Sequence, residues 1–218
     1  MTARTSLRPR DTVAKATSRI RHEGFKQAAE YYQRRNAGVP WLPQSTIAML
    51  DEMLLKTDRC LEWGSGTSTT WFADRCASIL SVENDPAWYQ RVRAELTEHG
   101  RDPDSVRLLS LEPTSRPAES PYVRAVDEFA DGKLDVCFVD AEHRPTCILE
   151  AMPKLATGGI LILDDVQGYL DHPSRCTYSR EGLGPLNDEW RTVAEALADW
   201  RLIWTTDRYS DCAVWVKP

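Results

Sequence analysis

The sequence predicts an α/β domain whose doubly wound, mostly parallel seven-stranded sheet ends in an antiparallel hairpin. Three observations lead to this prediction. Strand-like and helix-like segments alternate along residues 44–199. The strands expected at 134–139 and 160–163 are almost wholly apolar, as is typical of strands that helices cover on both faces. The last two strand-like segments, 202–205 and 213–216, are joined by a link too short for a crossover, so they must pair antiparallel.

Local signals place the individual elements. Asp85 followed by Pro86 is a typical helix start, and Gly100 is a typical residue just past a helix end. Segments 112–121 and 166–185 are polar and contain proline and glycine, so we expect loops there. Besides the hairpin, we expect strands at 60–63, 78–82, 106–109, 134–139 and 160–163, and helices at 12–35, 44–56, 67–73, 86–99, 123–130, 145–155 and 187–199.

The composition suits one folded domain and excludes several other classes. A length of 218 residues fits a single α/β domain with a short extension. Apolar residues at 42% and charged residues at 28% exclude wholesale disorder. We find no apolar run of the roughly 18 residues that a transmembrane helix needs, and no apolar N-terminal stretch typical of a secretion signal. The six cysteines form no CxxC pair, so we expect reduced, mostly buried thiols in a cytoplasmic protein.

The charge is distributed unevenly along the chain. Residues 1–35 contain nine basic and three acidic residues, so the rest of a chain of net charge −6 carries −12. A basic N-terminus is compatible with nucleic-acid or anion binding, but a solvated, partly frayed helix explains it equally simply. Because nucleic-acid binding requires a positive field, the acidic body argues against a nucleic-acid partner.

A glycine-rich turn and an acidic residue follow the first two predicted strands. Ligands of doubly wound sheets bind at the carboxyl ends of the strands. Gly64 and Gly66 allow a tight turn and a close approach of the backbone to a ligand, and the helix that follows offers free N–H groups. Glu83 ends the second strand, where its carboxylate can accept hydrogen bonds from two ribose hydroxyls. These features together predict a nucleoside-binding cleft.

The loop chemistry narrows the choice of nucleoside. A dinucleotide site requires G-x-G-x-x-G, but Thr69 stands at the third glycine position. Glu62, just before the loop, would repel a pyrophosphate and suits a ligand with an ammonium group. S-adenosylmethionine carries an ammonium group and a ribose but no phosphate. The alternative for both Glu62 and Glu83 is that they only cap the helices that follow them.

The same residues resemble a known family. The run Glu62-x-Gly64-x-Gly66 resembles the first motif of class I S-adenosylmethionine-dependent methyltransferases, and Glu83 is similar to their ribose-binding acid. Residues 138–143 and 155–165 resemble the fourth and fifth strand motifs of the small O-methyltransferase branch related to catechol O-methyltransferase. The resemblance covers about residues 40–218 and implies a Rossmann-like methyltransferase fold. We expect cofactor contacts from Glu62, Gly64, Ser65, Gly66, Ser68, Glu83, Asn84, Trp88 and Asp140.

Three carboxylates at neighbouring strand ends form the second candidate site. Asp140 follows the fourth strand, and Asp164 and Asp165 follow the fifth. Carboxylates in one cleft repel each other unless a cation or a proton intervenes, and oxygen ligands of this kind suit Mg²⁺. In the related metal-dependent O-methyltransferases, the matching positions hold Mg²⁺ against vicinal substrate oxygens, although the third ligand there is often asparagine. The alternative is that Asp164 and Asp165 cap the loop and Asp140 alone holds the substrate.

The expected reaction is direct in-line attack of an acceptor, most simply a hydroxyl, on the sulfonium methyl, in which the protein mainly orients the reactants. Mg²⁺ would make the acceptor an oxyanion near neutral pH. Without a metal, His143 or Asp140 would have to accept the proton, and His143 is a natural candidate because imidazole titrates near neutrality. The expected catalytic residues are therefore Asp140, His143 and Asp164. The alternative for His143 is a hydrogen bond to the loop backbone alone.

Two segments are expected to cover a small-molecule acceptor. Residues 31–44 and 166–186 are aromatic and polar and fall near the carboxyl rim of the sheet. We therefore divide the chain into an N-terminal helical cap, residues 1–43, and a cofactor-binding domain, residues 44–218. Deletion of residues 1–38 should weaken acceptor turnover and leave S-adenosylmethionine affinity nearly intact. We expect no nucleic-acid or membrane partner, and a homodimer is compatible with the sequence.

Two other function classes remain open at this point. One is a nicotinamide-dependent oxidoreductase, against which Thr69 and Glu62 speak. The other is a non-catalytic or divergent domain that binds S-adenosylmethionine and uses the basic N-terminus to contact a partner. The sequence does not identify the acceptor.

Overall fold

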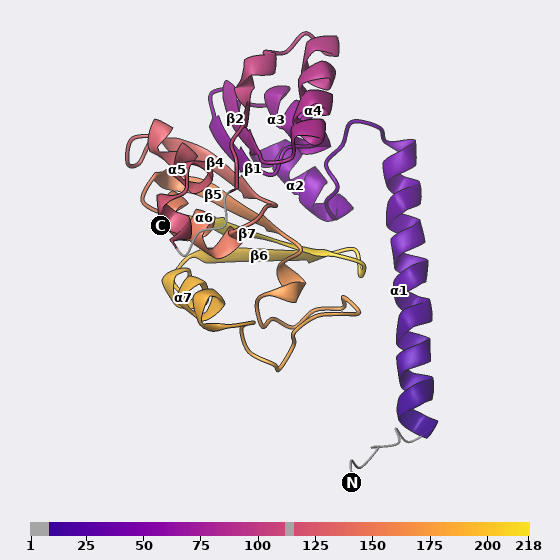
Figure 1. The fold of residues 1–218 in the computed structure, drawn as a ribbon. Coiled ribbons are helices and arrows are strands. Elements are labelled where there is room, and N and C mark those ends of the chain that lie inside the picture. The colour runs from indigo at the N-terminus through magenta and orange to yellow at the C-terminus, as the bar shows by residue number, and fades with distance from the viewer. Residues whose placement is uncertain (1–8, 112–115) are drawn as a thin grey trace.

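A seven-stranded sheet with helices on both faces forms the body of the protein (Figure 1). The computed structural model describes residues 9–111 and 116–218. Across the sheet the strand order is β3-β2-β1-β4-β5-β7-β6. The five strands β1 to β5 are parallel to one another, whereas β7 is antiparallel to both β5 and β6. This arrangement confirms the predicted fold class. The strands are β1 (Arg59–Trp63), β2 (Ser78–Glu83), β3 (Val106–Leu108), β4 (Leu134–Val139), β5 (Leu155–Asp164), β6 (Arg201–Thr206) and β7 (Asp211–Val216).

Two apolar clusters fix the helices to the two faces of the sheet. One cluster joins the sheet to α5, α6 and α7 through buried Tyr122, Ile148 and Trp190. The other joins it to α2 and α3 through Leu50 and Phe72, among others. With both faces covered, the strand ends form a rigid rim on which side chains can be positioned. The helices are α1 (Pro9–Arg35), α2 (Gln44–Met53), α3 (Thr67–Ala73), α4 (Pro86–Glu98), α5 (Pro121–Arg124), α6 (Arg144–Ala151) and α7 (Asp188–Ala196).

Several predicted boundaries were wrong for local reasons. The helix predicted at 145–155 ends at Ala151, because Pro153 cannot continue a helix, and residues 155–159 belong to β5. Gly159 lies there against backbone carbonyl oxygens of β4, so closely that an added Cβ would stand 3.2 Å or less from them. The helix predicted at 123–130 is only the short α5, followed by a 3₁₀ turn at Ala125–Glu128.

Other predictions hold with smaller shifts. Helices α2 and α7 end three residues before their predicted ends. The segment predicted as a loop at 166–185 contains only a 3₁₀ turn at Val166–Gly168. The loop predicted at 112–121 lies partly outside the described residues, and 117–119 form a 3₁₀ turn. All six cysteines are buried and free, as predicted.

Helix α1 stands beside the body of the protein (Figure 1). None of its residues from Ile20 to Arg35 is fully buried. The helix contacts the loops at the rim of the sheet, where His22 Nδ1 lies 2.9 Å from Thr177 Oγ1 and the Arg208 guanidinium lies 5.5 Å from the Phe25 ring. Among the described residues, no helix combines the length and the apolar character that a membrane crossing requires.

Candidate active site

The turn after β1 meets the end of β4 at the point where the winding of the sheet reverses. Trp63 and Val139 are paired, and the Asp140 N–H donates to the Trp63 carbonyl oxygen at 3.0 Å. Gly64 has φ 91°, and a Cβ there would stand 2.0 Å from the Asp140 carbonyl oxygen. Only glycine fits this position. The first glycine of the motif therefore brings the loop directly against Asp140.

Glu62 lies beneath this loop in a cage of hydroxyl groups. It is fully buried, and its carboxylate accepts hydrogen bonds of 2.5 Å from Ser68, Thr69 and Ser81. Burial raises the pKa of Glu62 to about 7, although the three hydroxyl donors oppose the shift. Thr69 also accepts a hydrogen bond from the Gly66 N–H at 2.9 Å, so the residue in place of the third glycine braces the loop. Glu62 therefore organises the loop, and its contact with a ligand stays a prediction.

Glu83 is held at the end of β2 by four protein donors. One oxygen accepts from the Asn84 and Asp85 N–H groups, both at 2.8 Å. The other accepts from the Ser65 N–H at 3.1 Å and from the Ser65 hydroxyl at 2.8 Å. A carboxylate has about four acceptor sites, so a ribose hydroxyl must share or displace one of these donors. The Ser65 hydroxyl is the one that can rotate away.

A cavity of about 320 Å³, here called the Glu83 cavity, opens beside this carboxylate. Several predicted cofactor residues line it together, which are Gly64, Ser65, Glu83, Asn84 and Asp140. Tyr122 and Arg144 also line it. The sequence did not single out Tyr122, because a tyrosine in a short apolar segment is typical of core.

A larger groove of about 1000 Å³ continues from the glycine loop between α3, α4 and the end of α1. Gly66, Ser68 and Trp88 line this groove and not the Glu83 cavity. The Trp88 indole N–H donates to the Ser65 carbonyl oxygen, and the Arg91 guanidinium lies 4.6 Å from the Trp88 ring. Trp88 therefore braces the loop through Ser65, and its predicted contact with the cofactor is untested.

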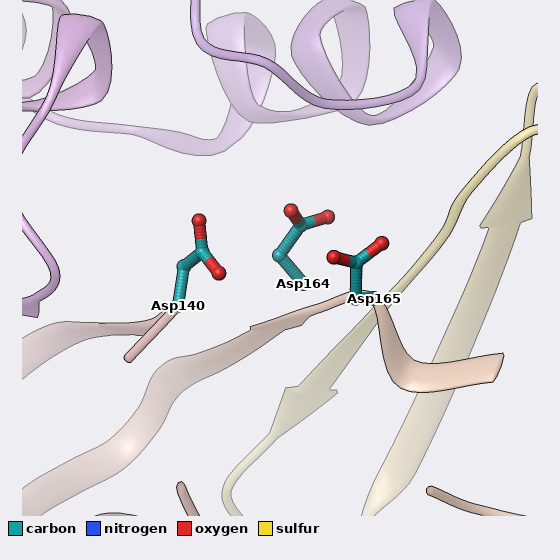
Figure 2. A group of neighbouring side chains, drawn as sticks. All are labelled: Asp140, Asp164 and Asp165. Carbon is teal, nitrogen blue, oxygen red and sulfur yellow. The ribbon is translucent and has the colours of Figure 1, made fainter. Parts of the chain in front are cut away.

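The three predicted carboxylates converge at the rim between β4 and β5 (Figure 2). Asp140, Asp164 and Asp165 each offer an oxygen, and these atoms lie within 4.8 Å of one another. Asp164 is buried, and its Oδ1 has no hydrogen-bond partner. Burial raises the pKa of Asp164 well above its ordinary value, and the carboxylates of Asp140 and Asp165 raise it further. Such an arrangement is suited to a bound cation.

The neighbours of this acidic cluster partly balance its charge. Partial burial raises the pKa of Asp140, the Arg144 guanidinium opposes that shift and Asp165 adds to it. Arg144 donates hydrogen bonds to an Asp140 carboxylate oxygen and to the Ala141 carbonyl oxygen. Asp165 Oδ1 accepts from the Ser210 hydroxyl at 2.8 Å. Asp164 Oδ1 has no such partner, so this oxygen is the one in the cluster that a cation would satisfy.

Two of the predicted site residues have a left-handed backbone. Asp165 has φ 55° and His143 has φ 53°, conformations that are unusual for residues other than glycine. At Asp165 this turn brings consecutive carboxylates to the same rim (Figure 2). His143 precedes α6 and lies outside the residues that line the cavities around Asp140. Its predicted role as a base has no support from this geometry and stays a prediction.

Aromatic residues stand over the acidic cluster. A cavity of about 290 Å³, here called the acidic cavity, is lined by the three aspartates and by Trp41, Tyr209 and Ser210. Trp41 lies in the predicted covering segment 31–44. Tyr209 and Ser210 were missed, although β7 runs antiparallel, so that the turn before it must lie at the same rim as the ends of β4 and β5. The His22 ring of α1 lies beside the Tyr209 ring, with ring centroids 5.1 Å apart and an interplanar angle of 43°.

Comparison with known proteins agrees with this arrangement. Residues 61–166 match a family model described as a methyltransferase domain. A search of curated proteins gives no match. The match to a methyltransferase domain agrees with the resemblance to class I S-adenosylmethionine-dependent methyltransferases seen in the sequence and speaks against an oxidoreductase.

Solved structures show the same fold at low sequence identity. A "putative caffeoyl-CoA O-methyltransferase" from Staphylococcus aureus is 16% identical, with TM-score 0.56 and coverage of 90% of this chain and 92% of that one. A "putative O-methyltransferase" from Klebsiella pneumoniae is 19% identical, with TM-score 0.54 and coverage of 89% and 90%. A methyltransferase-like protein from Silicibacter pomeroyi is 22% identical, with TM-score 0.55 and coverage of 81% and 87%.

Proposed function

We propose that the chain transfers the methyl group of S-adenosylmethionine to a hydroxyl of a small-molecule acceptor, with Mg²⁺ held by Asp140, Asp164 and Asp165. The observation that carries this proposal is the convergence of three carboxylates within 4.8 Å, one of which has a buried oxygen without a partner. Like charges at this separation are costly unless a cation balances them.

The residues fit the donor. Glu83 stands where ribose hydroxyls can reach it, and the loop from Gly64 to Gly66 brings backbone close to the ligand. When bound, S-adenosylmethionine would supply a methyl group on a positively charged sulfur, and an in-line acceptor oxygen would bond to the methyl carbon as the carbon–sulfur bond breaks and S-adenosylhomocysteine leaves. The protein binds and orients this group toward Asp140, which lines the Glu83 cavity, the glycine-loop groove and the acidic cavity alike. Orientation of the two reactants is the main contribution that a protein can make to such a transfer.

The residues also fit a hard divalent cation. All three candidate ligands are carboxylate oxygens, which Mg²⁺ prefers, and the open side of the cluster leaves room for substrate oxygens or water. When bound, Mg²⁺ lowers the pKa of a coordinated hydroxyl and thereby supplies the oxyanion nucleophile. Asp164 Oδ1 has no competing hydrogen bond to lose on binding.

The volume and the aromatic wall of the acidic cavity favour a small, flat acceptor. Its volume of about 290 Å³ lies near the lower limit for small-molecule sites. Trp41 and Tyr209 supply aromatic surface on its wall. The name of the Staphylococcus aureus neighbour attributes a caffeoyl-CoA substrate to that protein, which agrees with hydroxyl chemistry but not with any particular acceptor here.

A methyl-transfer assay with a panel of acceptors tests this proposal. The panel contains catechols, monophenols, sugars and aromatic amines, each with Mg²⁺ and with EDTA. We expect turnover of vicinal hydroxyl compounds with Mg²⁺ and loss of turnover with EDTA. Turnover of amines that EDTA does not change would contradict both the metal and the hydroxyl acceptor, and would favour proton acceptance by Asp140.

A further inference from the structure

The two oxygens of the Asp165 carboxylate have different surroundings. Oδ1 accepts a hydrogen bond from the Ser210 hydroxyl at 2.8 Å and another from the Gln167 side-chain amide at 3.2 Å. Among the described residues, none donates to Oδ2. In Figure 2 one oxygen of Asp165 lies on the side of Asp164 and the other on the side away from it. The protein therefore holds one oxygen of Asp165 and leaves the other for a ligand.

The two donors come from separate segments that the sheet brings to the same rim. Gln167 lies in the 3₁₀ turn directly after β5, and Ser210 immediately precedes β7. Because β5 and β7 pair antiparallel, with Asp164 opposite Cys212, the residue before β7 lies beside the residue after β5. Ser210 is buried, so the direction of its hydroxyl is constrained by its surroundings.

The orientation of the Gln167 amide is also fixed. Its Oε1 accepts from the Asp211 backbone N–H at 2.8 Å. A backbone N–H can only donate, so the amide oxygen must face Asp211 and the amide nitrogen is left to face Asp165. Both lone-pair positions of Asp165 Oδ1 are thus filled by donors that cannot easily turn away.

This arrangement limits how Asp165 can bind a cation. A carboxylate coordinates a metal through one oxygen or through both. Ca²⁺ takes about six to eight oxygens and often both oxygens of one carboxylate, whereas Mg²⁺ requires a near-octahedral shell at shorter distances. An oxygen that already accepts two hydrogen bonds has no lone pair left for a metal. Asp165 is therefore restricted to one metal bond through Oδ2, which suits Mg²⁺ better than Ca²⁺.

We infer that Ser210 and Gln167 are positioning residues that restrict Asp165 to one metal-facing oxygen and thereby shift the preference of the site toward Mg²⁺ and away from Ca²⁺. This inference rests on the proposed function, because it requires a divalent cation at Asp140, Asp164 and Asp165. It does not depend on the acceptor. Ser210 and Gln167 act only through Asp165 and do not themselves bind the cation.

The substitution Ser210→Ala tests this role by removing the shorter of the two hydrogen bonds. Calorimetric titrations of metal-free protein with MgCl₂ and with CaCl₂ give the two Kd values. We expect a Kd for Mg²⁺ about tenfold weaker, since loss of a residue that orients a metal ligand has at least this cost, and a Kd for Ca²⁺ that is unchanged or tighter. The ratio of the two values should therefore move about tenfold toward Ca²⁺.

Two further substitutions show whether the hydrogen bonds to Oδ1 cause the change. Gln167→Met removes the other donor and should move the ratio in the same direction by a smaller factor, because its hydrogen bond is longer. Ser210→Thr keeps a hydroxyl and should retain the wild-type ratio.

Ser174→Ala is the matched control. The Ser174 hydroxyl donates to the buried carboxylate of Asp211, so its loss loosens the start of β7 without removing a donor to Asp165. The ratio of the Mg²⁺ and Ca²⁺ Kd values should stay at the wild-type value. An unchanged ratio in Ser210→Ala, or an equal change in Ser174→Ala, would overturn the inference and leave the proposed metal site intact.

The outcomes also distinguish this inference from the proposed function. Wild-type protein that binds neither Mg²⁺ nor Ca²⁺ would contradict the proposed metal and overturn the inference with it. Protein that shows the expected change of ratio but methylates no hydroxyl acceptor would contradict the proposed acceptor chemistry and support the inference.

Discussion

The carboxylates at the β1–β2 rim and those at the β4–β5 rim differ in how many hydrogen-bond donors the protein gives them. Glu62 and Glu83 are buried and fully supplied with donors, three hydroxyls for one and four protein donors for the other. Asp164 is equally buried, yet one of its oxygens has no donor and two further carboxylates lie beside it. On the donor side, at the β1–β2 rim, both carboxylates are thus supplied with donors by the protein, whereas on the acceptor side, at the β4–β5 rim, one carboxylate oxygen is left without a partner.

The number of protein donors around a carboxylate indicates whether it holds the loop in place or binds a ligand. A carboxylate whose acceptor sites are occupied by its own protein holds a loop in place, as Glu62 does. A buried carboxylate that lacks hydrogen-bond donors and lies beside other carboxylates favours the binding of a cation. Glu83 stands between these cases, because one of its donors is the rotatable Ser65 hydroxyl. Four substitutions, taken in order of decreasing effect, test whether the two rims differ in this way.

The strongest effect is expected from Asp164→Asn. Loss of an outer-shell partner of a metal ligand already costs about 10- to 100-fold, so loss of a ligand should lower Mg²⁺-dependent turnover by about 100-fold or more. The melting temperature without metal should stay the same or rise, because like-charge repulsion at the rim decreases. Assays over a Mg²⁺ series, with thermal scans in Mg²⁺ and in EDTA, check both points. Unchanged turnover would show that Asp164 is not a ligand.

Glu62→Gln should change how stability depends on pH. The pKa of Glu62 is about 7 in the folded protein and 4.5 ordinarily, so the folded state binds the extra proton between these values. The free energy of unfolding should therefore fall as pH rises from about 4.5 to above 7, by about 3 kcal/mol more in wild type than in Glu62→Gln. Urea unfolding at several pH values in EDTA measures the difference. Parallel curves for the two proteins would contradict the raised pKa.

Glu83→Gln should weaken S-adenosylhomocysteine binding by about tenfold, because a carboxylate gives stronger hydrogen bonds to ribose hydroxyls than an amide does. The loss is moderate because Ser65 already occupies part of the carboxylate. Ser65→Ala is the matched control, since it frees an acceptor site on Glu83 and should bind the ligand as tightly as wild type or tighter. Calorimetry gives both values, and weaker binding by Ser65→Ala would show that its hydroxyl serves the ligand directly.

The weakest effect is expected at the contact of α1 with the rim. His22→Ala removes the hydrogen bond to Thr177 and the ring contact with Tyr209, which lines the acidic cavity. We expect a KM for the acceptor a few-fold higher and an unchanged Kd for S-adenosylhomocysteine. A change in the cofactor Kd alone would place α1 in the donor site instead.

The fold and much of the site could be predicted from the sequence because they depend on local signals. Alternation of apolar strands and helices, the turn at Gly64 and acids at strand ends each leave a pattern in adjacent residues. The contact of Gly64 with the Asp140 carbonyl oxygen follows from neighbouring strands of a parallel sheet.

What was missed depends on distant contacts. The hydroxyl cage around Glu62 needs Ser81 from another strand, and nothing near Glu62 in the sequence indicates it. Tyr122 lines the Glu83 cavity, yet in the sequence it stands in a short apolar segment and resembles a core residue. The end of α6 was misplaced because the glycine pair at 158–159 was weighted above Pro153, although the proline acts first.

A crystal structure with S-adenosylhomocysteine and Mg²⁺ would test most directly whether the donor side is complete in itself and the acceptor side awaits a cation. We predict one Mg²⁺ at about 2.0–2.1 Å from oxygens of Asp140, Asp164 and Asp165, with the ribose of the ligand on Glu83. Asp164 with no cation beside it at saturating Mg²⁺, or a ribose remote from Glu83, would contradict this division of the rim.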